Sequence, residues 1–104
     1  MSTERRFESN PSGTPTIPDW PLTNQVPMTA VAAEIAANRA GRGKVTIKNL
    51  DATNNLYVGR ENVTSSTGFE LGPGEGITLE TRNAVWGVCA AGQTATAGFL
   101  EDSP

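Results

Sequence analysis

The stretch FELGPGEGITLETRNAVWGV, residues 69–88, contains the local signals that decide the fold class. Its segment GPGEG (72–76) has the composition of either a phosphate-binding loop or a corner between two strands. A phosphate loop needs a lysine and a helix that begins directly after the glycines. Here no lysine follows, and the next residues, ITLET, alternate as in a β-strand. Pro73 and Gly74 suit the central positions of a turn, so the sequence predicts a corner.

The same rhythm of short alternating runs and turn residues continues through the rest of the chain. The runs are KVTIKNL (44–50), NNLYVG (54–59), FEL (69–71), GITLET (76–81), AVWGVCA (84–90) and TATAGFLE (94–101). Short strands joined by short turns predict an all-β fold, a small antiparallel β-sandwich or barrel-like domain. The predicted structural turn residues are Gly59, Gly68, Pro73 and Gly74. The predicted residues of the core or of a subunit interface are Val45, Ile47, Tyr57, Leu79, Val85, Trp86 and Phe99.

Residues 28–37, MTAVAAEIAA, are compatible with two structures. Alanine and glutamate favour a helix. With a period of two, however, Thr29, Val31, Ala33 and Ile35 face one way, as in a half-buried strand. The glycines of NRAGRG (38–43) indicate a turn, so a hairpin between this segment and residues 44–50 is the simpler interpretation.

Five of the seven prolines lie in residues 1–27. Proline has no backbone N–H and biases its predecessor toward extended backbone, so the sequence predicts an extended arm over 1–27 and a domain over 28–104. The arm contains spaced apolar side chains that we expect to bind a partner chain. An equally weighted alternative is that this segment folds back over its own domain. The candidate partner-binding residues are Phe7, Ile17, Trp20, Leu22 and Val26.

Composition excludes several function classes. The 104 residues include 8 basic and 11 acidic side chains, for a net charge of −3, with no basic run of the kind that binds nucleic acid phosphates. No apolar run approaches the roughly 20 residues that cross a bilayer, and no apolar segment follows Arg5 and Arg6 as in an export signal. One cysteine, Cys89, excludes an internal disulfide framework and fits a reducing compartment.

The sequence contains no histidine, which removes the commonest general base and metal ligand. We therefore expect no enzymatic activity, no metal and no cofactor. Cys89 has no histidine or lysine nearby and is expected to be a buried, inert thiol. The hydroxyls of SST (65–67) have no base, and Asn62 of NVT is expected to be an ordinary loop residue. The carboxylates of Glu70, Glu75, Glu80 and Glu101 are expected to be solvated charges.

Residues 28–104 resemble a small β-sandwich module of tailed-bacteriophage virion proteins. The pattern is Asn-Leu, Tyr-Val-Gly, Val-Thr and an aromatic-x-Leu, then a Pro-Gly-Glu corner, Ala-Val-aromatic, Ala-Gly-x-Thr-Ala and a final Leu-Glu. The matching residues are Asn49, Leu50, Tyr57, Val58, Gly59, Val63, Thr64, Gly68, Phe69, Leu71, Pro73, Gly74, Glu75, Ala84, Val85, Trp86, Ala91, Gly92, Thr94, Ala95, Leu100 and Glu101.

This resemblance implies a structural protein of the virion, made in the host cytoplasm, and favours a capsid decoration or cement protein on the shell. The implied partners are the major capsid protein or another virion protein, and further copies of the chain, with a trimer expected by analogy. It supplies no catalytic residue. The alternatives are a neck, tail or fibre-base accessory protein, or a carbohydrate- or receptor-binding module that uses Trp20, Tyr57 and Trp86.

Overall fold

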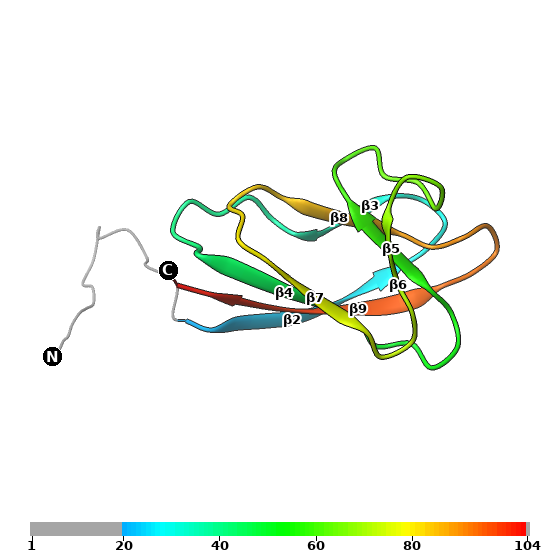
Figure 1. The fold of residues 1–104 in the computed structure, drawn as a ribbon, viewed down its shortest axis with the longest axis horizontal. Helices are drawn as coiled ribbons and strands as arrows, with labels where there is room; N and C mark the ends of the chain where they lie inside the picture. Colours follow the sequence, from blue (N-terminus) through cyan, green and yellow to red (C-terminus); the bar gives the residue numbers. More distant parts are fainter. Residues whose placement is uncertain (1–19, 104) are drawn as a thin grey trace, which may run out of the picture.

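The computed structural model describes residues 20–103, which form an all-β fold without any helix in that range (Figure 1). The strands are short, and those from β4 to β9 follow the predicted alternating runs closely. They are β2 (Leu22–Met28), β3 (Ala33–Ala36), β4 (Lys44–Asn49), β5 (Leu56–Gly59), β6 (Phe69–Leu71), β7 (Gly76–Leu79), β8 (Val85–Val88) and β9 (Ala95–Asp102).

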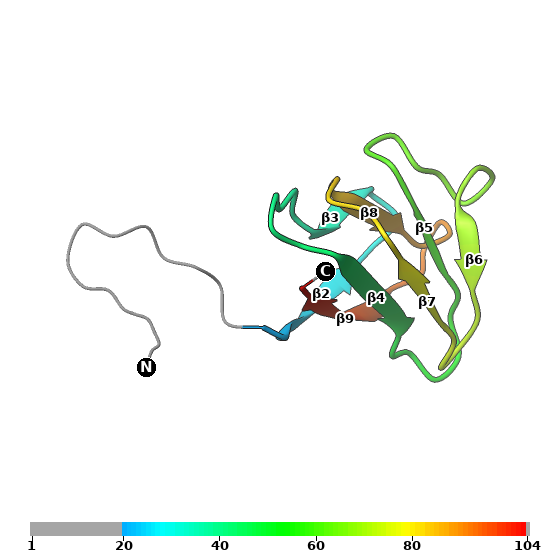
Figure 2. The same ribbon diagram turned by 60° about the vertical axis from the view of Figure 1, so that its left-hand side comes forward.

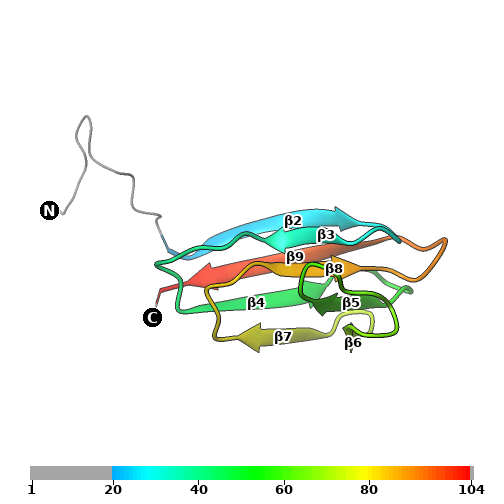
Figure 3. The same cartoon turned by 90° about the horizontal axis from the view of Figure 1, so that it is seen from above.

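These strands form two antiparallel sheets of four strands each. The first sheet has the order β2-β9-β4-β7 and the second has the order β3-β8-β5-β6. The sheets lie face to face, and the strand order of the first can be followed in Figure 3. The predicted all-β class, a small β-sandwich, is therefore confirmed.

The core lies between the two sheets because alternate side chains of each strand point inward. In β4, for example, Val45 and Ile47 are completely buried, whereas Lys44 and Lys48 are exposed. The residues predicted for a core or interface occupy three kinds of position. Val45, Ile47 and Val85 belong to the buried core, Leu79 and Phe99 are partly buried against it, and Tyr57 and Trp86 are half-buried.

Residues 33–36 form a strand, but the hairpin predicted between this region and residues 44–50 is wrong. Strand β3 pairs with β8 in the second sheet, whereas β4 pairs with β7 and β9 in the first. The segment 37–43 thus connects the two sheets instead of closing a hairpin. The strand also begins later than the predicted face of Thr29, Val31, Ala33 and Ile35, because Val31 precedes β3 and is 74% exposed.

The predicted boundary between arm and domain after residue 27 also needs correction. Strand β2 begins at Leu22 and pairs with β9 along its whole length, and Val26 packs against the core. Two of the predicted partner-binding residues, Leu22 and Val26, therefore lie in the domain's own sheet. An edge strand tolerates Pro27 because one side of its backbone has no strand partner.

Of the three remaining arm candidates, the structure describes only Trp20. Trp20 is half-buried, and its ring lies beside Gly41 in the β3–β4 connection. For residues 20–27 the structure thus agrees with the alternative of a chain that folds onto its own domain. Phe7 and Ile17 lie outside the described residues.

The corner predicted at GPGEG is present between β6 and β7. Gly74 has φ = 78°, and its N–H donates to the carbonyl of Asn49 over 3.0 Å. The Glu75 N–H donates to the Gly72 carbonyl over 3.0 Å, and the Glu75 carboxylate accepts the Gly72 N–H. Gly68 is required for close packing and not for its backbone conformation, since a Cβ there would lie 2.8 Å from the Cβ of Tyr57.

We expect Gly74→Val to lower the free energy of unfolding by about 1–2 kcal/mol, measured by urea denaturation. No atom lies within 4 Å of the position that a Cβ would take, so the cost arises from the backbone conformation alone. Gly74→Asn is the control, because asparagine adopts positive φ more readily, and it should lose less. Equal stability of the valine variant and the wild type would contradict the turn assignment.

Candidate functional site

One side of the first sheet faces away from the core and presents a row of small polar and apolar side chains. The strand register places Thr23 beside Leu100, Leu100 beside Thr46, and Thr46 beside Thr78. The hydroxyls of Thr46 and Thr78 lie 2.8 Å apart and share a hydrogen bond. Four strands therefore contribute one continuous row to an outward-facing surface.

Two leucine side chains on this surface are exposed to solvent. Leu50 and Leu100 are 41% and 40% exposed. Leu50 lies over Gly98, since a Cβ on that glycine would be 3.0 Å from Leu50 Cδ1. Between them runs a shallow groove of about 340 Å³, here called the sheet-face groove. Its outward-facing residues are Thr23, Gln25, Thr46, Lys48, Leu50, Gly98 and Leu100.

The chemistry of the sheet-face groove suits contact with another protein. It contains hydroxyls, an amide, one lysine and two leucines, on strands that hydrogen bonds hold rigidly in register. A carboxylate is missing from its described lining, so it has no acid–base pair. Exposed apolar side chains with a polar rim are typical of protein-binding surfaces.

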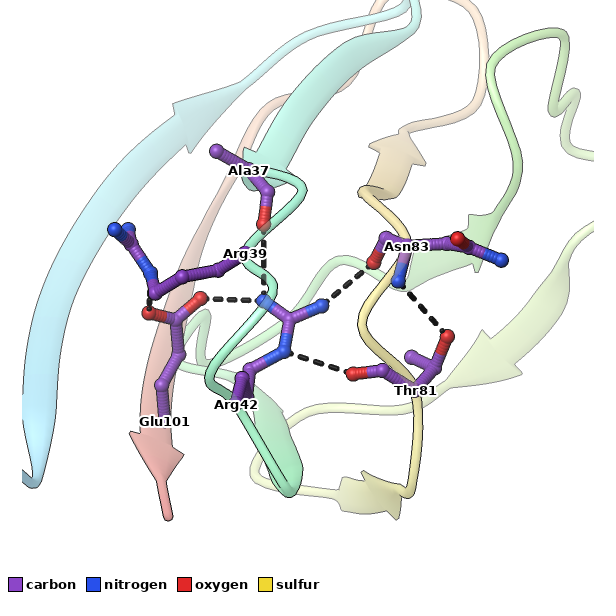
Figure 4. A network of polar contacts seen from close by, with 6 residues as sticks. All are labelled: Ala37, Arg39, Arg42, Thr81, Asn83 and Glu101. Carbon is purple, nitrogen blue, oxygen red and sulfur yellow. Dashed lines mark hydrogen bonds and ion pairs between the residues drawn. The ribbon is translucent and has the colours of Figure 1, made fainter. Parts of the chain in front are cut away.

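The end of the sandwich where β2 begins and β9 ends is held by a buried arginine (Figure 4). Arg42 is fully buried and its Nε donates to the Thr81 carbonyl over 2.8 Å. Its Nη1 donates to the Ala37 carbonyl (3.0 Å) and to the Glu101 carboxylate, and Nη2 donates to the Asn83 carbonyl (2.6 Å). Arg42 thus joins the β3–β4 connection, the β7–β8 connection and β9.

Glu101 is the buried acid of this network, so its predicted role as a solvated charge is wrong. Its side chain is 0% exposed, and Arg39 forms a second ion pair with it at 2.7 Å. A sequence signal existed, because Ala95, Ala97 and Phe99 are the inward positions of β9 and Glu101 continues that alternation. Nothing in the local pattern indicated Arg42, which lies in a segment that resembles a turn.

The other predicted acids occupy surface positions. Glu70, Glu75 and Glu80 are exposed, and Glu70 accepts a hydrogen bond from the Asn55 amide. No cluster of three or more potential metal-ligating side chains occurs among residues 20–103. Asp51 closes a local turn, in which the N–H groups of Asn54 and then Thr53 lower the pKa of its carboxyl below its usual 3.8.

The loop from residue 60 to 68 contains the predicted hydroxyl cluster and the NVT motif. Asn62 is exposed, and the hydroxyls of Thr64 and Thr67 lie 3.0 Å apart. Thr64 Oγ1 also accepts the N–H of Ser66 over 3.2 Å. These contacts shape the loop.

The three aromatic residues considered for sugar stacking lie on separate elements. Trp20 precedes β2, Tyr57 lies in β5 and Trp86 in β8, and all three are half-buried. In the register of the second sheet, Tyr57 stands opposite Val88 and Trp86 stands opposite Gly59.

Cys89 lies in the core, with 2% of its surface exposed. Burial raises the pKa of its thiol above the usual 9.0, and the charge of Asp51 adds to the effect. We therefore expect slow reaction with a thiol reagent at pH 8 and rapid reaction after denaturation in urea, because the thiolate is the reactive form. Rapid labelling of the native protein would contradict this placement.

No protein-family model, curated protein or solved structure matches the chain. The range 20–103 contains no helix that is long and apolar enough to span a membrane.

Proposed function

We propose that the protein is a non-enzymatic structural protein of tailed-bacteriophage particles, a decoration protein that binds the outer capsid shell. The observation that supports this function best is the sheet-face groove. Its two leucines are each about two-fifths exposed on a rigid sheet, in a domain with a small core. When such a surface binds a partner, its apolar side chains are buried, which contributes roughly 25 cal/mol of binding free energy per Å² of apolar surface.

An exposed sheet face suits a shell that presents the same site many times. A single domain of this size makes a modest interface, and weak contacts become stable attachment when several copies bind together. Residues 1–19 supply further contacts in this proposal, with Ile17 among their apolar groups. The resemblance of residues 28–104 to virion β-sandwich modules is the second line of support.

The test uses phage heads that have been stripped of this protein and then mixed with purified variants. Wild-type protein should rebind, and Leu100→Asp should bind at least 10-fold more weakly because it places a charge in the groove. Val31→Asp is the matched control, since Val31 is 74% exposed and does not line the groove, and it should bind like the wild type. Equal binding by the Leu100 variant and the control would reject the groove as the docking surface.

Copy number separates this function from its nearest alternative. We expect many copies per particle for a shell decoration protein and only a few for a neck, tail or fibre-base component. Quantitative mass spectrometry of purified particles measures this directly. Sedimentation of the free protein tests the trimer that the resemblance implies.

A further inference from the structure

Strands β7 and β6 are the edge strands on one side of the sandwich (Figure 2). A second recess, here called the lateral cleft, is lined by residues of both strands. Its volume is about 750 Å³, within the range of sites that hold large side chains or ligands. Ile77 and Leu79 of β7 line one wall, and Phe69 and Trp86 belong to the second sheet.

The lateral cleft exists because the two sheets have unequal edges. Strand β6 has three residues and begins at Phe69, opposite Val58, so the second sheet has no fourth strand beside Gly59. Strand β7 continues to Leu79 on the facing sheet. As a result Ile77 and Leu79 are only partly buried although they pack against the core, and Phe69 is 59% exposed.

The charged side chains of the lateral cleft are two acids and one base, Glu61, Glu80 and Arg60. Both ion pairs among residues 20–103 involve Glu101, so Glu61 and Glu80 have no cationic partner within that range. The cleft thus combines an apolar interior with an excess of negative charge. Its chemical complement is an aromatic or aliphatic side chain adjacent to cations.

The chain itself contains such a segment. Within residues 1–19, Phe7 is the one aromatic side chain, and Arg5 and Arg6 directly precede it. We propose that Arg5–Phe7 of one copy binds in the lateral cleft of a second copy. Phe7 packs against the apolar wall, and the arginines pair with Glu61 and Glu80.

The length of the intervening chain favours a second copy over the same molecule. Fifteen residue steps separate Phe7 from Leu22, where β2 begins, and Pro11, Pro15, Pro18 and Pro21 lie between them. Proline-rich chain is semi-rigid and spans about 3.1 Å per residue, hence roughly 45 Å in total. Strand β7 is three strand spacings from β2 in its own sheet, or about 14 Å. We therefore expect a proline-rich spacer of this length to reach past its own cleft to a neighbour.

Photo-crosslinking tests where residue 7 binds and in which copy. Benzoylphenylalanine replaces Phe7, and equal amounts of ¹⁴N- and ¹⁵N-labelled protein are mixed before irradiation. Cleavage after Arg60 and Arg82 gives a single tryptic peptide, 61–82, that contains Phe69, Ile77, Leu79 and both acids of the cleft. We expect this peptide as the main partner, with about half of the cross-linked pairs carrying mixed isotopes. Cross-links without mixed isotopes, or cross-links to other peptides, would overturn the proposal.

Charge reversal provides an independent readout by sedimentation velocity. The double variant Arg5→Glu/Arg6→Glu should raise the dissociation constant for self-association at least 10-fold. Adding Glu61→Arg/Glu80→Arg to it should restore most of the association. Arg82→Glu is the control, because Arg82 is exposed and does not line the cleft, and it should associate like the wild type.

A wild-type protein that stays monomeric at high concentration, or a double variant that associates normally, would reject the contact. Both experiments use purified protein without phage particles. A negative result in them would therefore not bear on the proposed binding to the shell, which the rebinding experiment tests. The contact between copies is additional to that proposed function.

Discussion

Replacing Arg42 with methionine is expected to lower the free energy of unfolding by about 3–5 kcal/mol, the usual cost of removing one partner of a buried ion pair. The Glu101 carboxylate would then remain fully buried with Arg39 as its one cationic partner. The carbonyls of Ala37, Thr81 and Asn83 would also lose their donor. Urea denaturation followed by tryptophan fluorescence measures the change.

Two further variants make this prediction specific. Arg82→Met is the matched control, because Arg82 lies on the β7–β8 connection that Arg42 contacts but is itself exposed, and its loss should be below about 0.5 kcal/mol. The double variant Arg42→Met/Glu101→Leu removes both charges and should be more stable than Arg42→Met alone. If Arg42→Met were no less stable than the control, the network would not hold this end of the sandwich together.

Deletion of residues 1–27 is expected to abolish cooperative unfolding, whereas deletion of residues 1–19 should leave it intact. The longer deletion removes the paired length of β2 from Leu22 to Pro27 and the partly buried side chain of Val26. It also exposes the backbone of β9 along one edge. A domain of this size has a total stability of about 5–15 kcal/mol, which the loss of a whole strand can exceed.

Circular dichroism and urea titration of both truncated proteins test this expectation. The shorter deletion is the control, since it retains Trp20 beside Gly41 and every register pair between β2 and β9. A folded 28–104 fragment with wild-type stability would show that β2 contributes little to the domain. The shorter deletion is also the suitable form for measuring what residues 1–19 add to binding.

The fold class was accessible from the sequence because alternation is a local signal. Lys44–Asn49 and Phe69–Leu71 were predicted almost at their observed bounds, since inward and outward side chains differ at every step. The corner at Gly74 was equally accessible, because a positive φ strongly favours glycine. The burial of Cys89 was expected from its place in the alternating run AVWGVCA, with no histidine or lysine nearby.

The candidate surfaces were less accessible, since they depend on which strands become neighbours. The leucine at position 50 gave no sign that it would lie over Gly98, 48 residues later in the sequence. The lateral cleft results from the unequal edges of two sheets, and no local pattern encodes the length of an edge strand relative to its facing partner.

The sequence alone thus determined the β-class, the approximate positions of most strands and the corner between β6 and β7. The tertiary structure decided that Leu22–Met28 is a strand of the domain, that β3 and β4 belong to different sheets, and that Glu101 is buried. The physical reason is the range of the interactions. Alternation depends on neighbours two residues apart, whereas these three features depend on pairing and ion contacts between residues some 50 to 80 positions apart, such as Ala33 with Gly87, Leu22 with Glu101 and Arg42 with Glu101.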